Sequence, residues 1–184
     1  KIRNYLQISN KLIVFNNTKN ENRIGYFKTE LVKPISPNYF NDKKRTSAII
    51  SLCSLLNSLL PESQPNKKIY QLFETFLNNI KLDNWIYLYI FFEINLIKEL
   101  GFDTNLRVFD QLTNKDELYK KIEFDNFKYE VPIFLIKGEI PENIKEGTIK
   151  KSLLFTRNIF MNKFFLPNNL IFPKSRIIFE NYFN

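Results

Sequence analysis

Hydrophobic and polar residues alternate with a period of two near the start of the chain. The segments 11–15 and 23–32 are rich in β-branched and aromatic residues, and the polar segment 16–20 between them is typical of a turn. This pattern predicts an antiparallel hairpin. Because two strands cannot bury a core by themselves, the hairpin must pack on the residues that follow or belong to a larger sheet.

A helical period replaces this alternation beyond Pro37. Apolar residues recur every three or four positions over 46–60, and Pro61 ends the run. Asn66 is placed to cap a second helix, in which apolar residues recur over 69–80. The two stripes predict two amphipathic helices that share a core.

A third helix is predicted over 85–100, where nearly every side is apolar, as in a helix surrounded by others. Asp83 is placed to cap its start, and Gly101 followed by Phe102 predicts a Schellman-type ending. Glu93 interrupts the apolar sequence. Since a buried carboxylate needs a partner, we expect a structural ion pair there.

The remaining sequence is less regular. Short alternating runs at 119–124 and 127–131 are consistent with a small hairpin inside the polar region 103–138. A fourth long helix is predicted over 143–165, and a last short one from Pro173 to residue 183. The expected fold is therefore mainly α, a helical domain preceded by a small β-sheet.

The composition excludes several kinds of chemistry. The chain has no His, one Cys (Cys53) and four Gly, so it has no Ser-His-Asp triad, no Cys/His zinc site, no internal disulfide and no phosphate-binding glycine loop. Cys53 lies among leucines and is expected to be a packing residue. The acidic residues between 103 and 125 share no metal-binding spacing, so we expect solvated loop acids, no cofactor and no enzymatic activity.

Charge is unevenly distributed along the chain. The total of +8 divides into +7 over residues 1–45, −4 over 46–144 and +5 over 145–184. Two basic ends that met on one face would suit a polyanion. The alternative is that codon drift in an AT-rich genome produced a generally basic surface. The longest apolar stretch, 85–97, is shorter than the roughly 20 residues that cross a bilayer, so no membrane partner is expected.

Three segments in one order resemble a known family. The runs 59–66 (LLPESQPN), 72–74 (LFE) and 92–102 (FEINLIKELGF) are similar to the helical core of the bacterial RecO recombination mediators. The run 23–32 (RIGYFKTELV) resembles the last strand of that family's N-terminal OB barrel, immediately ahead of the same helices. The closing stretch, 157–160 and 166–176, is similar to the family's last helices, more weakly.

This resemblance implies a DNA repair protein without enzymatic activity. Such a protein binds single- and double-stranded DNA, anneals strands, and works with RecR to help RecA displace single-strand-binding protein (SSB). The implied location is the cytoplasm, with the nucleoid. The implied domains are the last strands of an incomplete OB fold in residues 1–40 and a helical domain in 41–184, with a small irregular or β insertion around 103–138.

The sequence departs from the family pattern in two respects. An OB barrel has about five strands, and only two or three fit before residue 46, so we expect the front of the barrel to lie outside this sequence. Many family members also carry a four-cysteine zinc site after the segment that matches 100–102. The corresponding residues here, 105–111, contain no Cys, and we expect no zinc.

DNA binding requires cations spaced along a path, with aromatic faces on which bases stack. Tyr26 and Phe27 offer such faces, although alternation along a strand predicts that one of the two packs in a core. The cations that we expect to contact DNA are Arg3, Lys11, Lys19, Arg23, Lys28, Lys43, Lys44 and Arg45.

A second basic set lies near the C-terminus. From it we choose Lys150, Lys151 and Arg157 as a receiver for the acidic, aromatic-ended tail of SSB, which needs a cation beside an apolar pocket. The alternative is the wet side of an amphipathic helix. The other function class that remains open is a helical protein-interaction scaffold without nucleic-acid binding, and a metal-dependent nuclease is a more distant third.

Overall fold

The computed structural model describes residues 5–17, 25–112, 117–124, 126–142 and 146–184. Two strands, β1 (Lys11–Asn17) and β2 (Tyr26–Lys33), form the expected antiparallel hairpin, with a register shift between Lys11 and Leu12. A 3₁₀ turn, η2 (Ser36–Tyr39), leads from this hairpin into the helices.

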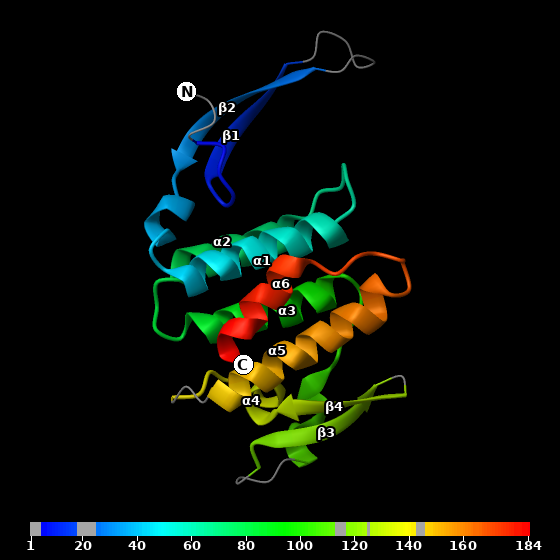
Figure 1. The fold of residues 1–184 in the computed structure, drawn as a ribbon. Helices are drawn as coiled ribbons and strands as arrows, with labels where there is room; N and C mark the ends of the chain where they lie inside the picture. The colour runs from blue at the N-terminus through cyan, green and yellow to red at the C-terminus, as the bar shows by residue number, and fades with distance from the viewer. Residues whose placement is uncertain (1–4, 18–24, 113–116, 125, 143–145) are drawn as a thin grey trace.

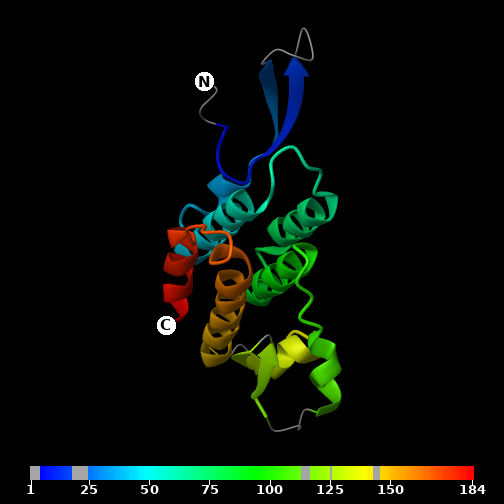
Figure 2. The same ribbon diagram turned by 90° about the vertical axis from the view of Figure 1, so that its right-hand side faces the viewer.

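The helices form the middle of the molecule. The hairpin β1–β2 extends from one end of the helical part, and a second hairpin, β3–β4, lies at the opposite end (Figure 1). Figure 2 shows α6 beside α1, where these two elements are in contact. The helices are α1 (Lys43–Leu59), α2 (Lys67–Asn79), α3 (Trp85–Glu99), α5 (Glu146–Phe160) and α6 (Lys174–Glu180).

Shorter elements complete the chain. A π-helical turn, η4 (Met161–Phe165), continues α5, so the fourth helix that the sequence predicts ends where expected. The small hairpin is confirmed as β3 (Tyr119–Phe124) and β4 (Phe127–Pro132). The last predicted helix is found as α6 continued by η5 (Asn181–Phe183). The sequence pattern did not reveal η3 (Leu106–Leu112) or α4 (Ile133–Lys137).

The helix ends follow local chemistry in most places. Gly101 has φ +99°, the amide of Phe102 donates to the carbonyl of Ile97 at 3.1 Å, and that of Gly101 to the carbonyl of Lys98 at 2.9 Å. These two bonds confirm the predicted Schellman motif. The expectation for Asp83 is wrong, because α3 begins after Asn84, whose side chain makes no capping bond.

Helix α3 occupies the centre of the core. Trp85 and eight other residues of this helix are buried, which confirms a helix surrounded by others. It packs on α2 through Phe76 and Phe92, with ring centroids 6.4 Å apart, and on α6 through Tyr89 and Phe179, at 4.3 Å. Burial of such large aromatic side chains supplies much of the hydrophobic stabilisation.

A fully buried ion pair crosses this core. Arg176 of α6 and Glu93 of α3 are both 0% exposed, and the guanidinium donates to the two carboxylate oxygens at 2.6 and 3.0 Å. Glu180 accepts a third bond from Arg176 at 3.1 Å, and the carbonyl of Leu153 a fourth at 2.9 Å. The prediction that Glu93 has an ionic partner is therefore confirmed.

Hydroxyl groups complete the network around Glu93. Tyr89 donates to the carboxylate at 2.9 Å and Thr156 of α5 at 2.5 Å, while the Tyr89 hydroxyl also lies 2.7 Å from the Ser51 hydroxyl of α1. Burial would lower the pKa of Arg176, but the charge of Glu93 outweighs it and the pKa is raised. Arg176 therefore stays charged, and the network links α1, α3, α5 and α6.

A chain of aromatic rings attaches the region 102–132 to α5. The Phe124 ring lies 6.4 Å from that of Phe102 and 6.0 Å from that of Phe109. On the other side it lies 5.8 Å from Tyr129, which lies 5.6 Å from Phe155 of α5. This insertion has no cysteines for a zinc site, and it packs on the helices through its own aromatic side chains.

We predict that Glu93→Gln destabilises the fold far more than the same substitution at Glu99, on the same helix. Removing the charge of Glu93 leaves Arg176 buried without its main partner, which costs about 3–5 kcal/mol. Glu99 pairs at 3.6 Å with an exposed lysine, Lys68, so Glu99→Gln should cost below about 1 kcal/mol. Urea unfolding followed by circular dichroism measures both, and equal losses would contradict this role for the pair.

Candidate nucleic-acid interface

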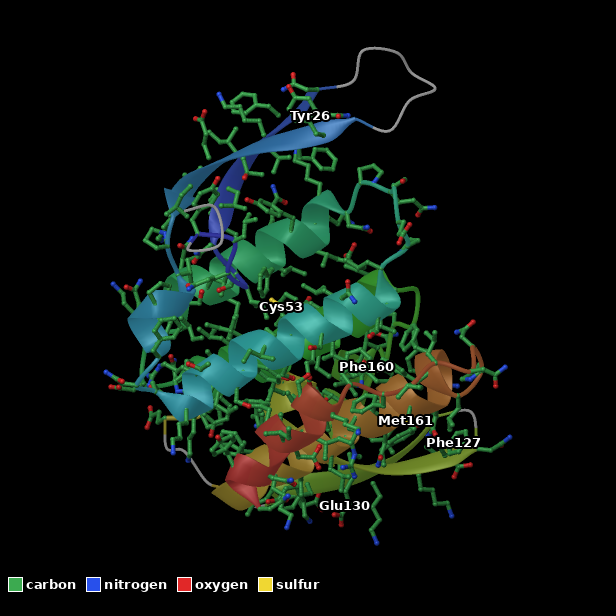
Figure 3. The ribbon with its side chains drawn as sticks, turned by 45° about the horizontal axis from the view of Figure 1, so that its top comes forward. Tyr26, Cys53, Phe127, Glu130, Phe160 and Met161 are labelled. Atoms are coloured by element: carbon green, nitrogen blue, oxygen red, sulfur yellow. The ribbon has the colours of Figure 1, made fainter. Side chains whose placement is uncertain are left out.

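The outer half of the β1–β2 hairpin extends away from the helices. Tyr26 is 69% and Phe27 70% exposed, so the expectation that one of these rings packs in a core is wrong for this structure. Both lie at the start of β2, beyond the reach of the helical part, and Figure 3 shows Tyr26 at the outer end of the hairpin. The hairpin therefore carries open aromatic rings on both sides, and Tyr26 is separated from Lys28 by one residue on the same strand face.

The predicted cations of the hairpin differ in their surroundings. Lys28 is largely exposed, with its ammonium 3.7 Å from the carboxylate of Glu30. Lys11 forms an ion pair with Glu74 of α2, whose hydrogen bond raises the pKa of Lys11 and fastens the base of the hairpin to the helices. The predicted contacts Arg3, Lys19 and Arg23 lie outside the described residues.

The three basic residues at the start of α1 also differ in their surroundings. Lys43 is exposed, and the ammonium of Lys44 lies 5.0 Å from the ring centre of Phe183. Arg45, in contrast, has internal partners. These are the carboxylate of Asp42 at 2.6 Å, the carbonyls of Ile80 at 2.7 Å and Leu82 at 3.2 Å, and the ring of Trp85, 5.3 Å from the guanidinium carbon.

Asp42 connects this cluster to the helix itself. Its side chain accepts the backbone N–H of Arg45 at 2.9 Å and so caps α1. Burial would raise the pKa of Asp42, but the hydrogen bonds from Arg45 outweigh it and the pKa is lowered. Asp42 and Arg45 thus fix the start of α1, while Lys43 and Lys44 remain on its surface.

Of the three cations predicted near the C-terminus, the structure brings two together. Lys150 and Lys151 of α5 line a groove of about 520 Å³ between α5 and the β3–β4 hairpin. Lys151 pairs with Glu130 at 2.6 Å and lies 3.8 Å from the ring centre of Tyr119. Sequence reasoning missed Lys128, which lines the same groove, because nothing in the sequence places β4 against α5.

Two arginines near the C-terminus belong to the fold. Arg157 is not among the residues that line the groove, and it pairs with Glu180 at 3.0 Å. Arg176, which also contributes to the positive charge of residues 145–184, is fully buried and cannot reach an external polyanion. The hairpin β1–β2 and the groove lie at opposite ends of the molecule, so their cations do not share one face (Figure 1). The two basic segments meet instead at the start of α1, where Lys44 lies against Phe183.

Metal-ligating groups, the thiol and long apolar helices give three further findings. No group of three or more His, Cys, Asp or Glu close enough to hold a metal occurs in the part of the chain that the structure describes. Burial raises the pKa of Cys53 to about 11, so this thiol is protonated at neutral pH, as a packing residue would be. No helix within the described ranges is long and apolar enough to cross a membrane.

Comparison with known proteins finds relatives of the segment that contains the first three helices. Residues 41–108, which include all of α1, α2 and α3, match the family model "Recombination protein O C terminal". The DNA repair protein RecO of a Wolbachia species from Drosophila simulans is 36% identical over 102 residues. The RecO protein of Ehrlichia chaffeensis is 33% identical over 103. The part of the chain that contains these helices is thus similar to the RecO proteins, which are named DNA repair proteins.

The extent of these matches differs. The Wolbachia match covers 54% of this chain and the Ehrlichia match 55%, and each covers 42% of the relative, so the aligned part is less than half of those RecO proteins. The RecO protein of Rickettsia bellii is 26% identical over 172 residues, which are 86% of this chain and 70% of that protein. No solved structure gives a significant match.

Proposed function

We propose that this chain acts as a recombination mediator that binds DNA without cleaving it. It would bind single- and double-stranded DNA, anneal complementary strands and, with RecR, assist the loading of RecA on DNA coated by SSB, at the nucleoid. Similarity to the RecO proteins supports the class of function, and the surface of the β1–β2 hairpin supports DNA as the ligand.

The single observation that carries this proposal is the open hairpin. It places an exposed cation, Lys28, beside exposed aromatic rings, on an element that the helices leave accessible. Binding of single strands without sequence preference uses this combination, because phosphates need cations and every base has a face for stacking.

The start of α1 offers a second region for phosphates. Lys43 and Lys44 occupy the first turn of the helix, where the partial positive charge of the helix dipole opposes them, and the cap Asp42 offsets only part of this. A phosphate bound there would relieve the repulsion. Arg45 was predicted to bind DNA as well, and we propose that it acts indirectly, by holding this turn in place.

The groove between α5 and the β3–β4 hairpin suits an acidic peptide. Lys128 and Lys150 supply cations there, and Leu154, which is 37% exposed, supplies an apolar contact beside Tyr119. We propose that the acidic, aromatic-ended tail of SSB docks here, on Lys150 and Lys151 as expected, with Lys128 in place of Arg157.

DNA binding predicts a salt dependence to which Lys43 and Lys44, at the start of α1, contribute. A labelled single-stranded oligonucleotide, titrated across a salt series, should show a log–log slope near −4, as expected for about six phosphate contacts at roughly 0.7 each. The double variant Lys43→Ala/Lys44→Ala should make the slope shallower by about 1.4. A matched control, Lys121→Ala/Lys137→Ala, removes the same charge from exposed residues at the far end of the molecule. A slope that both double variants change equally would refute a local contact.

Peptide binding gives an independent prediction. A labelled acidic peptide that ends in phenylalanine should bind in low salt, and Lys128→Ala/Lys150→Ala should weaken its binding by about tenfold, as for the loss of charge-assisted hydrogen bonds on an exposed surface. Lys43→Ala/Lys44→Ala serves as the control and should leave peptide binding unchanged. Fluorescence anisotropy measures both, and an equal effect of the two double variants would argue against this groove.

A further inference from the structure

The pairing register divides the β1–β2 hairpin into two unlike faces. Residues directly opposite each other in an antiparallel pair lie on the same face. Phe15 is opposite Lys28, and Asn17 is opposite Tyr26, so these four share one face with Ile13 and Glu30, which we call the charged face. The other, the uncharged face, consists of Leu12, Val14, Asn16, Phe27, Thr29 and Leu31.

The protein already begins to cover the uncharged face. Beyond Lys11, the two strand residues that are partly buried are Leu12 and Thr29, and both lie on this face. The hydroxyl of Tyr5 donates to the carbonyl of Thr29 at 3.2 Å and lies 3.5 Å from its hydroxyl, so the preceding segment runs over the same side. The uncharged face is therefore the one on which the preceding segment of the same chain packs.

The charged face is open and carries two aromatic rings, the cation Lys28 and the carboxylate of Glu30. Tyr26 and Phe15 are 69% and 45% exposed. They are diagonal neighbours across the strands, a position in which Cβ atoms lie roughly 7–8 Å apart, and Lys28 stands directly opposite Phe15. The ion pair of Lys28 with Glu30 is exposed and weak, so the ammonium can turn toward a phosphate.

We infer that the two neighbouring rings of β2 have different roles. Tyr26, together with Phe15, stacks on the bases of a single strand whose phosphate Lys28 contacts, and Phe27, on the opposite face, makes no base contact. The inference rests on the proposed DNA binding and deepens it, because it assigns base contact to one side of the hairpin. Alternation along the strand places the two rings on opposite faces but does not tell which face binds DNA. The pairing register shows which residues accompany each ring.

Alanine substitutions at the two positions form a matched pair. Tyr26→Ala should weaken binding of a labelled (dT)₂₀ oligonucleotide by about 5- to 150-fold, the range for loss of one base–aromatic stack. Tyr26→Phe keeps the ring and should bind within about threefold of the original protein. Phe27→Ala should bind with unchanged affinity.

The salt dependence separates stacking from charge. Tyr26→Ala should leave the slope of affinity against salt concentration unchanged, since a stacked ring neutralises no phosphate. Lys28→Ala should make that slope shallower by about 0.7. A merely structural role of Tyr26 would also alter the circular dichroism spectrum of the free protein, which the inference expects to stay the same.

Tryptophan reporters test the geometry without relying on affinity. The one natural tryptophan, Trp85, is 6% exposed and provides a constant background. The fluorescence of Tyr26→Trp should be quenched when (dT)₂₀ binds, because the indole stacks on a base, whereas that of Phe27→Trp should not change.

The outcomes distinguish this inference from the proposed function. If the original protein binds (dT)₂₀ but Tyr26→Ala binds equally well, or if Phe27→Trp is the quenched variant, the assignment of faces is wrong and DNA binding stands. If the original protein fails to bind the oligonucleotide in low salt, both are overturned.

Discussion

The buried pair between Arg176 and Glu93 is the interaction on which the helical part depends. Two fully desolvated charges are tolerated in a protein core only when their remaining hydrogen-bonding capacity is also met. Here Tyr89 and Thr156 donate to the carboxylate, and Glu180 and the carbonyl of Leu153 accept from the guanidinium. These contacts fix α6 against α3 and α5 in one orientation, because a shift of any of these helices would leave a charge unpaired.

This constraint separates the cations that build the fold from those that remain for ligands. Arg45, Arg157 and Arg176 each hold two or more elements together, a task for which the fork of guanidinium donors is well suited. Among the described residues, the candidate ligand contacts are lysines, including Lys28, Lys43 and Lys150. A rigid core of helices thus carries lysine-bearing surfaces at both ends, the β1–β2 hairpin at one and the groove beside β3–β4 at the other (Figure 1).

Much of the fold follows from local sequence, because periodicity and end signals act over a few residues. The first hairpin, the helix that ends at Gly101 and the need of Glu93 for a partner are all of this kind. The identity of that partner is not, since Arg176 lies 83 residues away and its sequence context matches that of a surface cation. Local reasoning also assigned Asp83 as a cap, although the chain enters α3 one residue later.

Local sequence is also insufficient to identify the residues of the candidate site. Charge density along the sequence located the basic ends but could not tell Arg45 from Lys43, since the carbonyls that engage Arg45 come from the turn after α2. Alternation along β2 separated Tyr26 from Phe27 without revealing which side faces outward. The pairing register and the contact of Tyr5 with Thr29 supply that information, and both depend on segments distant in the chain.

Hydrogen–deuterium exchange with and without a single-stranded oligonucleotide tests the central claim most directly, because it reports every surface of the protein at once. The account predicts protection in β2 and in the first turn of α1, with β3, β4 and α5 unchanged. Protection confined to the groove between α5 and the β3–β4 hairpin, or no protection in a complex shown to form, would contradict it.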